Sequence, residues 1–133
     1  KESGFGRILV IGSSGMVVPI PKLAVSNTLR SAVGGYVKTL AEQVASFGVT
    51  CNMVLPGRVE TLRTQAIDQA TAKALGVSEE DARARSIATI PAGRYGEPRE
   101  FGAVVTFLAS EQAGYITGSQ IRVDGGAIRS INA

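Results

Sequence analysis

Three short segments of the chain are predicted to form strands of a parallel sheet. They lie at Arg7–Ile11, Val49–Leu55 and Ser119–Val123, and a glycine or proline turn follows each of them. Ile8 to Ile11 is an unbroken apolar run, which is the pattern of a strand covered on both faces, and Val49–Leu55 is a second probable buried strand. The segments therefore predict a sheet of three main parallel strands, with Ile8 to Ile11 fully buried.

A long helix is expected from about Leu23 to Phe47, where apolar residues recur with a helical period and Gly48 suits the stop. A rotation of about 100° per residue gives this helix one stripe that faces the core: Val33, Val37, Leu40, Ala41 and Val44. Ser26 and Arg30 continue the stripe toward the helix start.

An arginine in line with a core face is unusual, and this one would stand at the carboxyl end of the first strand. In open α/β sheets, ligands bind at that edge. We therefore take Ser13, Ser26 and Arg30 as a candidate site. Two simpler interpretations remain: Ser13 caps a turn, and Arg30 extends from the sheet edge to water.

The remaining elements complete an α/β layer with right-handed parallel crossovers. Helices are expected at Thr64–Leu75, after the capping box Ser78-Glu79-Glu80-Asp81, and from Pro98 onward. The first two helices suit a substrate lid and a plain surface pair equally well. A second apolar strip on the long helix indicates that another helix packs against it, either from this chain or from a second subunit: Leu29, Ala32, Tyr36 and Phe47.

Composition narrows the function classes. The 133 residues, 44% of them hydrophobic, suffice for one globular domain or half of a larger one. The net charge of +3 is scattered along the chain, which favours an ordinary mixed surface over nucleic-acid binding. One cysteine, Cys51, and no histidine leave no basis for a disulfide, a Cys-based metal site or a hydrolase that uses Ser13. Without an apolar run long enough to cross a membrane, we expect a soluble cytoplasmic protein with no membrane partner.

Several motifs fall in the order and spacing of a known family and cover nearly the whole chain. They are Ile11-Gly12-Ser13, Ser26 with Arg30, Pro56-Gly57-x-x-x-Thr61, Gly93-Arg94-Tyr95-Gly96-x-Pro98-x-Glu100, Phe107-Leu108-Ala109-Ser110, Tyr115-Ile116-Thr117-Gly118 and Val123-Asp124-Gly125-Gly126. With them the chain resembles the C-terminal half of short-chain dehydrogenases/reductases, and within them the 3-oxoacyl-acyl-carrier-protein reductase branch. The resemblance implies an α/β fold, in which residues 1–133 form the C-terminal part of a Rossmann-like doubly wound parallel sheet.

The resemblance also implies hydride transfer between NAD or NADP and a small carbonyl or alcohol substrate, with a 3-oxoacyl thioester as one candidate. In the family a serine polarises the substrate oxygen, a tyrosine delivers the proton, and a lysine holds the nicotinamide ribose. Ser13 matches the serine. Pro56, Gly57 and Val59 would lie along the nicotinamide, and Thr61 would contact its carboxamide or phosphate. A homo-oligomer, either a dimer or a tetramer, is implied as well.

The chain departs from the family pattern in two ways. The glycine-rich dinucleotide turn does not occur in these residues, so we expect this piece alone to be inactive and to lack the half that binds adenosine and pyrophosphate. The tyrosine and lysine positions hold Ser26 and Arg30. A serine hydroxyl is a much weaker acid than a phenol, and arginine keeps its proton, although Arg30 could still hold a ribose or phosphate. Two hypotheses follow: an oxidoreductase with an altered proton relay, or a cofactor-binding or structural relative that has lost the chemistry.

Overall fold

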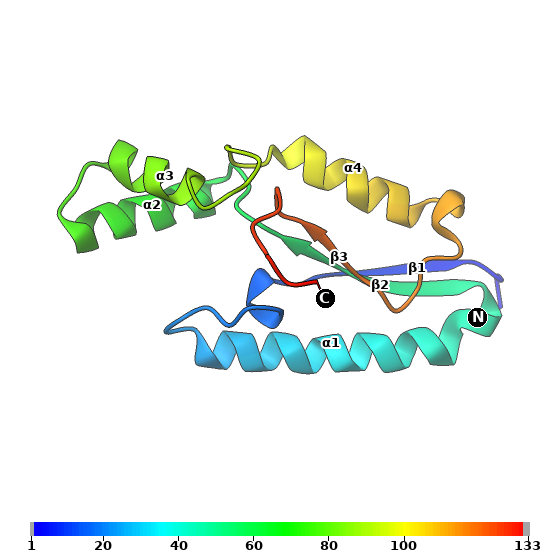
Figure 1. Ribbon diagram of the computed structural model, residues 1–133. Coiled ribbons are helices and arrows are strands. Elements are labelled where there is room, and N and C mark those ends of the chain that lie inside the picture. The colour runs from blue at the N-terminus through cyan, green and yellow to red at the C-terminus, as the bar shows by residue number, and fades with distance from the viewer. Residues whose placement is uncertain (1, 132–133) are drawn as a thin grey trace.

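The computed structural model describes residues 2–131 and consists of a three-stranded parallel sheet between helices (Figure 1). The strands are β1 (Gly6–Ile11), β2 (Val49–Pro56) and β3 (Gln120–Val123), in the order β1-β2-β3. The α-helices are α1 (Ala24–Val44), α2 (Leu62–Leu75), α3 (Glu79–Ile87) and α4 (Pro98–Ala109). Short 3₁₀ helices follow β1, α1 and α4: η1 (Ser14–Met16), η2 (Ala45–Phe47) and η3 (Glu111–Ala113).

The helices form layers on both faces of the sheet. Figure 1 shows α1 along one face and α4 along the other, while α2 and α3 extend beyond one end of the sheet as a pair. This arrangement, with helices on both faces of a parallel sheet, confirms the predicted α/β class and the parallel strands. No helix in the described part of the chain has the length and apolar character needed to span a membrane.

The central strand, β2, divides the core in two because successive side chains point to opposite faces. Cys51, Met53 and Leu55 pack toward α1, and Val54 packs with Leu108 of α4. Cys51 is fully buried, and this burial raises the pKa of its thiol. A buried thiol with a raised pKa is unreactive, so Cys51 is a residue of the core.

The prediction of a fully buried first strand is wrong for β1. Ile8 is 38% exposed and Ile11 is 48% exposed. The reason is topological: β1 pairs only with β2, from Gly6 opposite Val49 to Ile11 opposite Val54, and is an edge strand within residues 2–131. An apolar strand with an unpaired edge is normally covered by further structure.

The long helix has the predicted extent but a slightly different buried face. Helix α1 is continued by η2 to Phe47, and Gly48 ends it in the left-handed conformation, with φ of 71°. Val37, Ala41 and Val44 are buried as predicted, but the next buried position toward the helix start is Gly34, and Val33 is 42% exposed. A Cβ atom at Gly34 would lie 2.7 Å from the Met16 Cε atom, so the glycine allows close packing there. Arg30 remains in line with this corrected face, one turn before Gly34.

A buried asparagine joins the centre of the sheet to the segment that leads into β3. The Nδ2 atom of Asn52 donates to the Ile116 carbonyl at 2.7 Å, and its Oδ1 atom accepts from the Ser119 N–H at 3.0 Å. On the same side of β2, the buried Thr50 hydroxyl has no hydrogen-bond partner among the described residues. Asn52 therefore has its hydrogen bonds satisfied and Thr50 does not, so the two positions can be compared by substitution.

We expect Asn52→Ala to lower the free energy of unfolding by about 2–4 kcal/mol, since it leaves two half-buried backbone groups without partners and removes a fully buried side chain. Thr50→Val should instead raise it by about 1 kcal/mol, because it removes an unsatisfied hydroxyl and keeps the shape. Urea unfolding of the full-length protein measures both changes. A loss below about 0.5 kcal/mol in Asn52→Ala, within the range of ordinary surface substitutions, would contradict this account of the core.

Candidate functional site

The carboxyl ends of the three strands bring the predicted site segments to one edge of the sheet. Pairing continues one residue past the strands: the Gly12 N–H donates to the Val54 carbonyl, and the Gly57 N–H donates to the Val123 carbonyl, each at 2.9 Å. The turn that carries Ser13 therefore lies beside the Pro56-Gly57 turn. This is the edge at which ligands bind in open α/β sheets.

Ser13 is held by the turn that it caps. Its backbone is extended, with φ of −158° and ψ of 148°, and its Oγ atom accepts a hydrogen bond from the Gly15 N–H at 3.1 Å. The turn-capping interpretation of Ser13 is thus correct. It also leaves the hydroxyl proton free, because accepting this bond uses only a lone pair of the oxygen. Ser13 is half-buried and can donate that proton to a ligand oxygen.

Arg30 reaches from α1 to the end of β1. Its Nη1 atom donates to the Gly12 carbonyl, the residue before Ser13, at 3.3 Å. The side chain is exposed, and no carboxylate within residues 2–131 forms an ion pair with it. Ser26 lies one turn earlier on the same helix and is half-buried. Arg30 and Ser13 therefore come together through Gly12, with an unpaired positive charge at the sheet edge.

The segment after β2 is fixed by close backbone packing and by a helix cap. A Cβ atom at Gly57 would lie 2.6 Å from the Asp124 Cα atom, so only glycine fits this turn. Thr61 begins α2, and its Oγ1 atom accepts from the Thr64 N–H at 3.3 Å. Val59 is half-buried and forms a parallel bridge with Gly96. Pro56 and Gly57 thus lie at the shared edge, and Val59 and Thr61 follow in the segment that connects this edge to α2.

Hydrogen bonds and an ion pair tie the α2–α3 helix pair to the rest of the molecule. The Tyr95 hydroxyl donates to both carboxylate oxygens of Asp68, at 2.9 and 3.0 Å, and both residues are buried. The Arg83 guanidinium lies 4.4 Å from the Tyr95 ring centre and forms two hydrogen bonds with Glu60, at 2.8 and 2.6 Å. Burial is the main reason that the pKa of Tyr95 is raised, and the hydrogen bond from Arg83 lowers the pKa of Glu60.

This network contains residues that the sequence analysis did not connect. The sequence does contain one sign of the network. Asp68 lies between Thr64 and Ala72 on the buried stripe of α2, so a carboxylate interrupts a face that packs inward. A buried acid of this kind needs a donor, and the donor is Tyr95, 27 residues later. The buried phenol is thus committed to Asp68.

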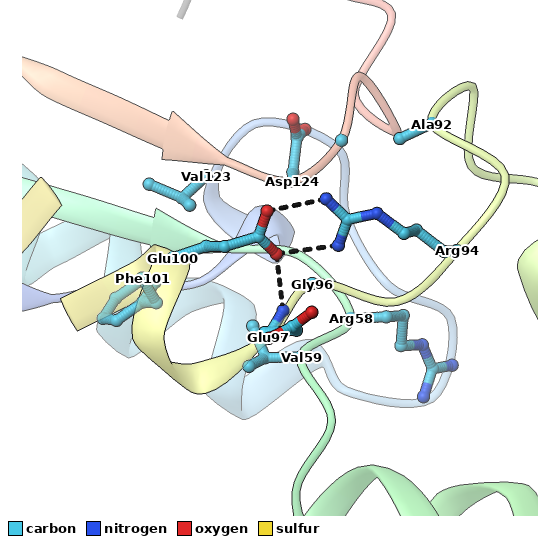
Figure 2. Close-up of a pocket in the computed structure, with 11 residues that line it drawn as sticks. Arg58, Val59, Ala92, Arg94, Gly96, Glu97, Glu100, Phe101, Val123 and Asp124 are labelled. Carbon is cyan, nitrogen blue, oxygen red and sulfur yellow. Dashed lines mark hydrogen bonds and ion pairs between the residues drawn. The ribbon is translucent and has the colours of Figure 1, made fainter. Parts of the chain in front are cut away.

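Two cavities adjoin this part of the site. One of about 430 Å³ lies between α2 and α3 and is lined by Glu60, Thr61, Leu62, Gln65, Asp68, Glu79 and Arg83. The other, of about 110 Å³, is the one in Figure 2, where Arg94 and Glu100 point toward each other and the Arg58 guanidinium points away. Arg94 forms two hydrogen bonds with Glu100, at 2.7 and 2.6 Å, and they lower the pKa of Glu100 to about 2. Only the larger cavity borders Thr61.

Residues 2–131 contain no group of three or more His, Cys, Asp or Glu side chains placed to hold a metal ion. The groups at the carboxyl ends of the strands are hydrogen-bond donors: the Ser13 hydroxyl, the Arg30 guanidinium and the backbone of the Pro56-Gly57 turn. Such a set suits hydroxyl, carbonyl or phosphate oxygens.

Known proteins resemble this chain in sequence and in fold. The family model described as enoyl-(acyl carrier protein) reductase matches residues 1–127. The chain is 40% identical over 123 residues to the 3-oxoacyl-[acyl-carrier-protein] reductase FabG of Vibrio harveyi, covering 91% of this chain and 45% of that protein. The structure of YwfH, an NADPH-dependent reductase involved in bacilysin biosynthesis, matches with a TM-score of 0.91 and 32% identity over 98% of this chain and 50% of its own.

A variant of actinorhodin polyketide ketoreductase, in a structure with NADPH, matches with a TM-score of 0.88 and 33% identity. The match covers 95% of this chain and 48% of that one. The chain thus spans about half the length of the curated relatives and solved structures that it matches.

Proposed function

The chain belongs to the short-chain dehydrogenase/reductase family, and on that premise we propose that it is the C-terminal half of an NAD(P)-dependent oxidoreductase that acts on a small carbonyl or alcohol. The observation that carries the proposal is the position of Arg30, whose guanidinium meets the Gly12 carbonyl beside Ser13. The unpaired edge of β1 within residues 2–131 and the half-length match to relatives support assigning the chain to one half of a domain.

The donor set at the edge fits a nicotinamide nucleotide. Arg30 has no carboxylate partner within residues 2–131, so its guanidinium is free to hold a ribose hydroxyl or a phosphate. The Pro56-Gly57 turn would flank the nicotinamide, with Val59 alongside it and the Thr61 hydroxyl near its carboxamide or phosphate. When bound, the nicotinamide supplies or accepts the hydride.

Ser13 would polarise the substrate oxygen. The Gly15 N–H fixes its Oγ atom, so the hydroxyl proton can be directed at a carbonyl oxygen that gains negative charge as hydride arrives. A donor preorganised in this way stabilises the transition state more than the ground state.

The proton relay must differ from the tyrosine-based relay of the family. Of the three tyrosines in the chain, Tyr95 is buried against Asp68, Tyr115 is fully exposed, and Tyr36 lies ten residues beyond Ser26, or about 15 Å along the helix. We propose that Ser26 passes a proton from water while Arg30 stabilises the charge that develops nearby. The second candidate function is that of a relative that binds cofactor without chemistry; it draws its support from the same two residues, because neither a serine hydroxyl nor an arginine is an effective acid near neutral pH.

The outer face of α1 supports assembly into a homo-oligomer. Val25, Leu29 and Tyr36 are exposed by 73%, 61% and 67%. They lie on the side away from the sheet, where a second copy would cover them.

The test is turnover by the full-length protein with NADH, NADPH and their oxidised forms, followed by absorbance. A panel of ketones, 3-oxoacyl thioesters and secondary alcohols covers the substrate class. We expect turnover of at least one member, and Ser13→Ala should lower its kcat by about a hundredfold or more, the usual effect of losing one such donor. Micromolar cofactor binding without any turnover would favour the alternative of a relative that has lost the chemistry.

A further inference from the structure

The loop between β1 and α1 carries Ser13, and one side chain of α1 fastens it. Asn27, the neighbour of Ser26, donates from its Nδ2 atom to the Ile20 carbonyl at 3.0 Å. Its backbone N–H donates to the Leu23 carbonyl at 2.8 Å. Both ends of the turn formed by residues 20–23 are thus attached to the first turn of α1.

That turn is strained at Lys22. The Leu23 N–H donates to the Ile20 carbonyl at 3.2 Å, with Pro21 and Lys22 as the two central residues. Lys22 has a φ of 66°, the only positive φ outside glycine in the described chain. A turn with proline first and a positive φ second normally takes glycine or asparagine at that second position. The Asn27 amide supplies a second hydrogen bond to Ile20 and so helps hold a conformation that lysine disfavours.

The same amide packs against the turn that orients Ser13. A Cβ atom at Gly15 would lie 2.5 Å from the Asn27 Oδ1 atom, so the asparagine lies directly against the Gly15 backbone. Gly15 is buried, and its N–H is the donor that fixes the Ser13 Oγ atom. Asn27 therefore touches both halves of the loop, while its helix carries Ser26 and Arg30.

We propose that Asn27 is a positioning residue, which fastens the loop of residues 12–23 to α1 and so fixes the Ser13 hydroxyl relative to Ser26 and Arg30. Asn27 does not need to touch cofactor or substrate for this role. The inference rests on the proposed function, because Ser13 matters only if it polarises a substrate oxygen.

The test compares Asn27→Ala with Thr28→Ala in the full-length protein. Thr28 is the next residue on α1 and is exposed, which makes it a matched control. We expect Asn27→Ala to lower kcat about tenfold to a hundredfold, the scale of a small misplacement at a reacting group. The dissociation constant of NADPH should change less than about twofold, since Asn27 is not among the residues proposed to contact the cofactor and misplacement of the reacting group acts on kcat.

Two further measurements separate positioning from general stability. Hydrogen exchange should be faster across residues 12–23 in Asn27→Ala and unchanged in Thr28→Ala. Adding Lys22→Gly to Asn27→Ala should recover part of kcat, because glycine adopts the positive φ without strain. Recovery of this kind is not expected if Asn27 only stabilises the helix.

The results also distinguish this inference from the proposed function. Equal kcat and equal exchange in the two alanine variants would overturn the inference, as would faster exchange with unchanged kcat. A wild-type protein without turnover on the whole panel would contradict the proposed function instead. In that case faster exchange in Asn27→Ala would still support the fastening of the loop, and unchanged exchange would overturn it.

Discussion

Replacing Arg30 by alanine should weaken NADPH or NADH binding to the full-length protein by about 1.5–3 kcal/mol, the scale of a hydrogen bond to a charged group. This corresponds to a rise in the dissociation constant of about tenfold to a hundredfold. The expectation follows from the guanidinium at the Gly12 carbonyl, beside Ser13, without an acidic partner within residues 2–131. Calorimetric titration measures the change directly.

Two further variants sharpen this test. Arg85→Ala removes an exposed arginine from α3 and controls for the loss of one positive charge. Arg30→Lys keeps the charge but loses the planar guanidinium, and should fall between wild type and Arg30→Ala. If Arg30→Ala binds cofactor as tightly as Arg85→Ala, Arg30 is a surface charge and the site reduces to Ser13 and the Pro56-Gly57 turn.

The double substitution Ser26→Tyr with Arg30→Lys should create or raise carbonyl reduction. It would restore the proton donor and the cation of the family at positions thirteen and seventeen residues after Ser13. A phenol has an ordinary pKa of about 10, and a nearby ammonium would lower it. A positioned acid of this kind contributes about a hundredfold or more to rate, which steady-state assays on the ketone panel would detect.

The matched control is Ser26→Phe with Arg30→Lys, which has the same ring without the hydroxyl. Reduction should rise only in the tyrosine variant, and its rate should depend on pH through the new phenol. Equal rates in the two double variants would show that the ring acts by packing, and that no proton passes through position 26.

Local sequence patterns were sufficient for the three strands and for α1, because buried runs and helical periods depend on nearby residues. Those patterns did not predict which side chains of β1 are exposed. Ile8 and Ile11 are exposed because the neighbour of an edge strand is decided by topology, which an apolar run does not encode. The sequence pattern also placed Val33 on the buried face of α1, where the structure has Gly34. This difference depends on the packing of Met16 against Gly34, which is a tertiary contact that a helical period does not encode.

Part of the candidate site could also be predicted from the sequence, and part could not. The spacing of Ser13, Ser26 and Arg30 was visible in the sequence, and the structure brings Ser13 and Arg30 together through Gly12. The roles of Asn27 and of the Asp68–Tyr95 pair were not visible, because each depends on a partner brought close only by the folded chain.

The structure is compatible with both interpretations of α2 and α3, as a substrate lid and as a surface pair. The pair extends from the sheet, as Figure 1 shows, and is tied to it through Glu60 and Tyr95.

The measurement that tests the central claim most directly is a crystal structure of the full-length protein with NADP⁺ bound. The account predicts a hydrogen bond between the Arg30 guanidinium and the nicotinamide ribose, with the nicotinamide beside the Pro56-Gly57 turn and facing the Ser13 hydroxyl. A cofactor bound away from this edge, or an Arg30 side chain directed to solvent with the ribose held by other residues, would contradict it.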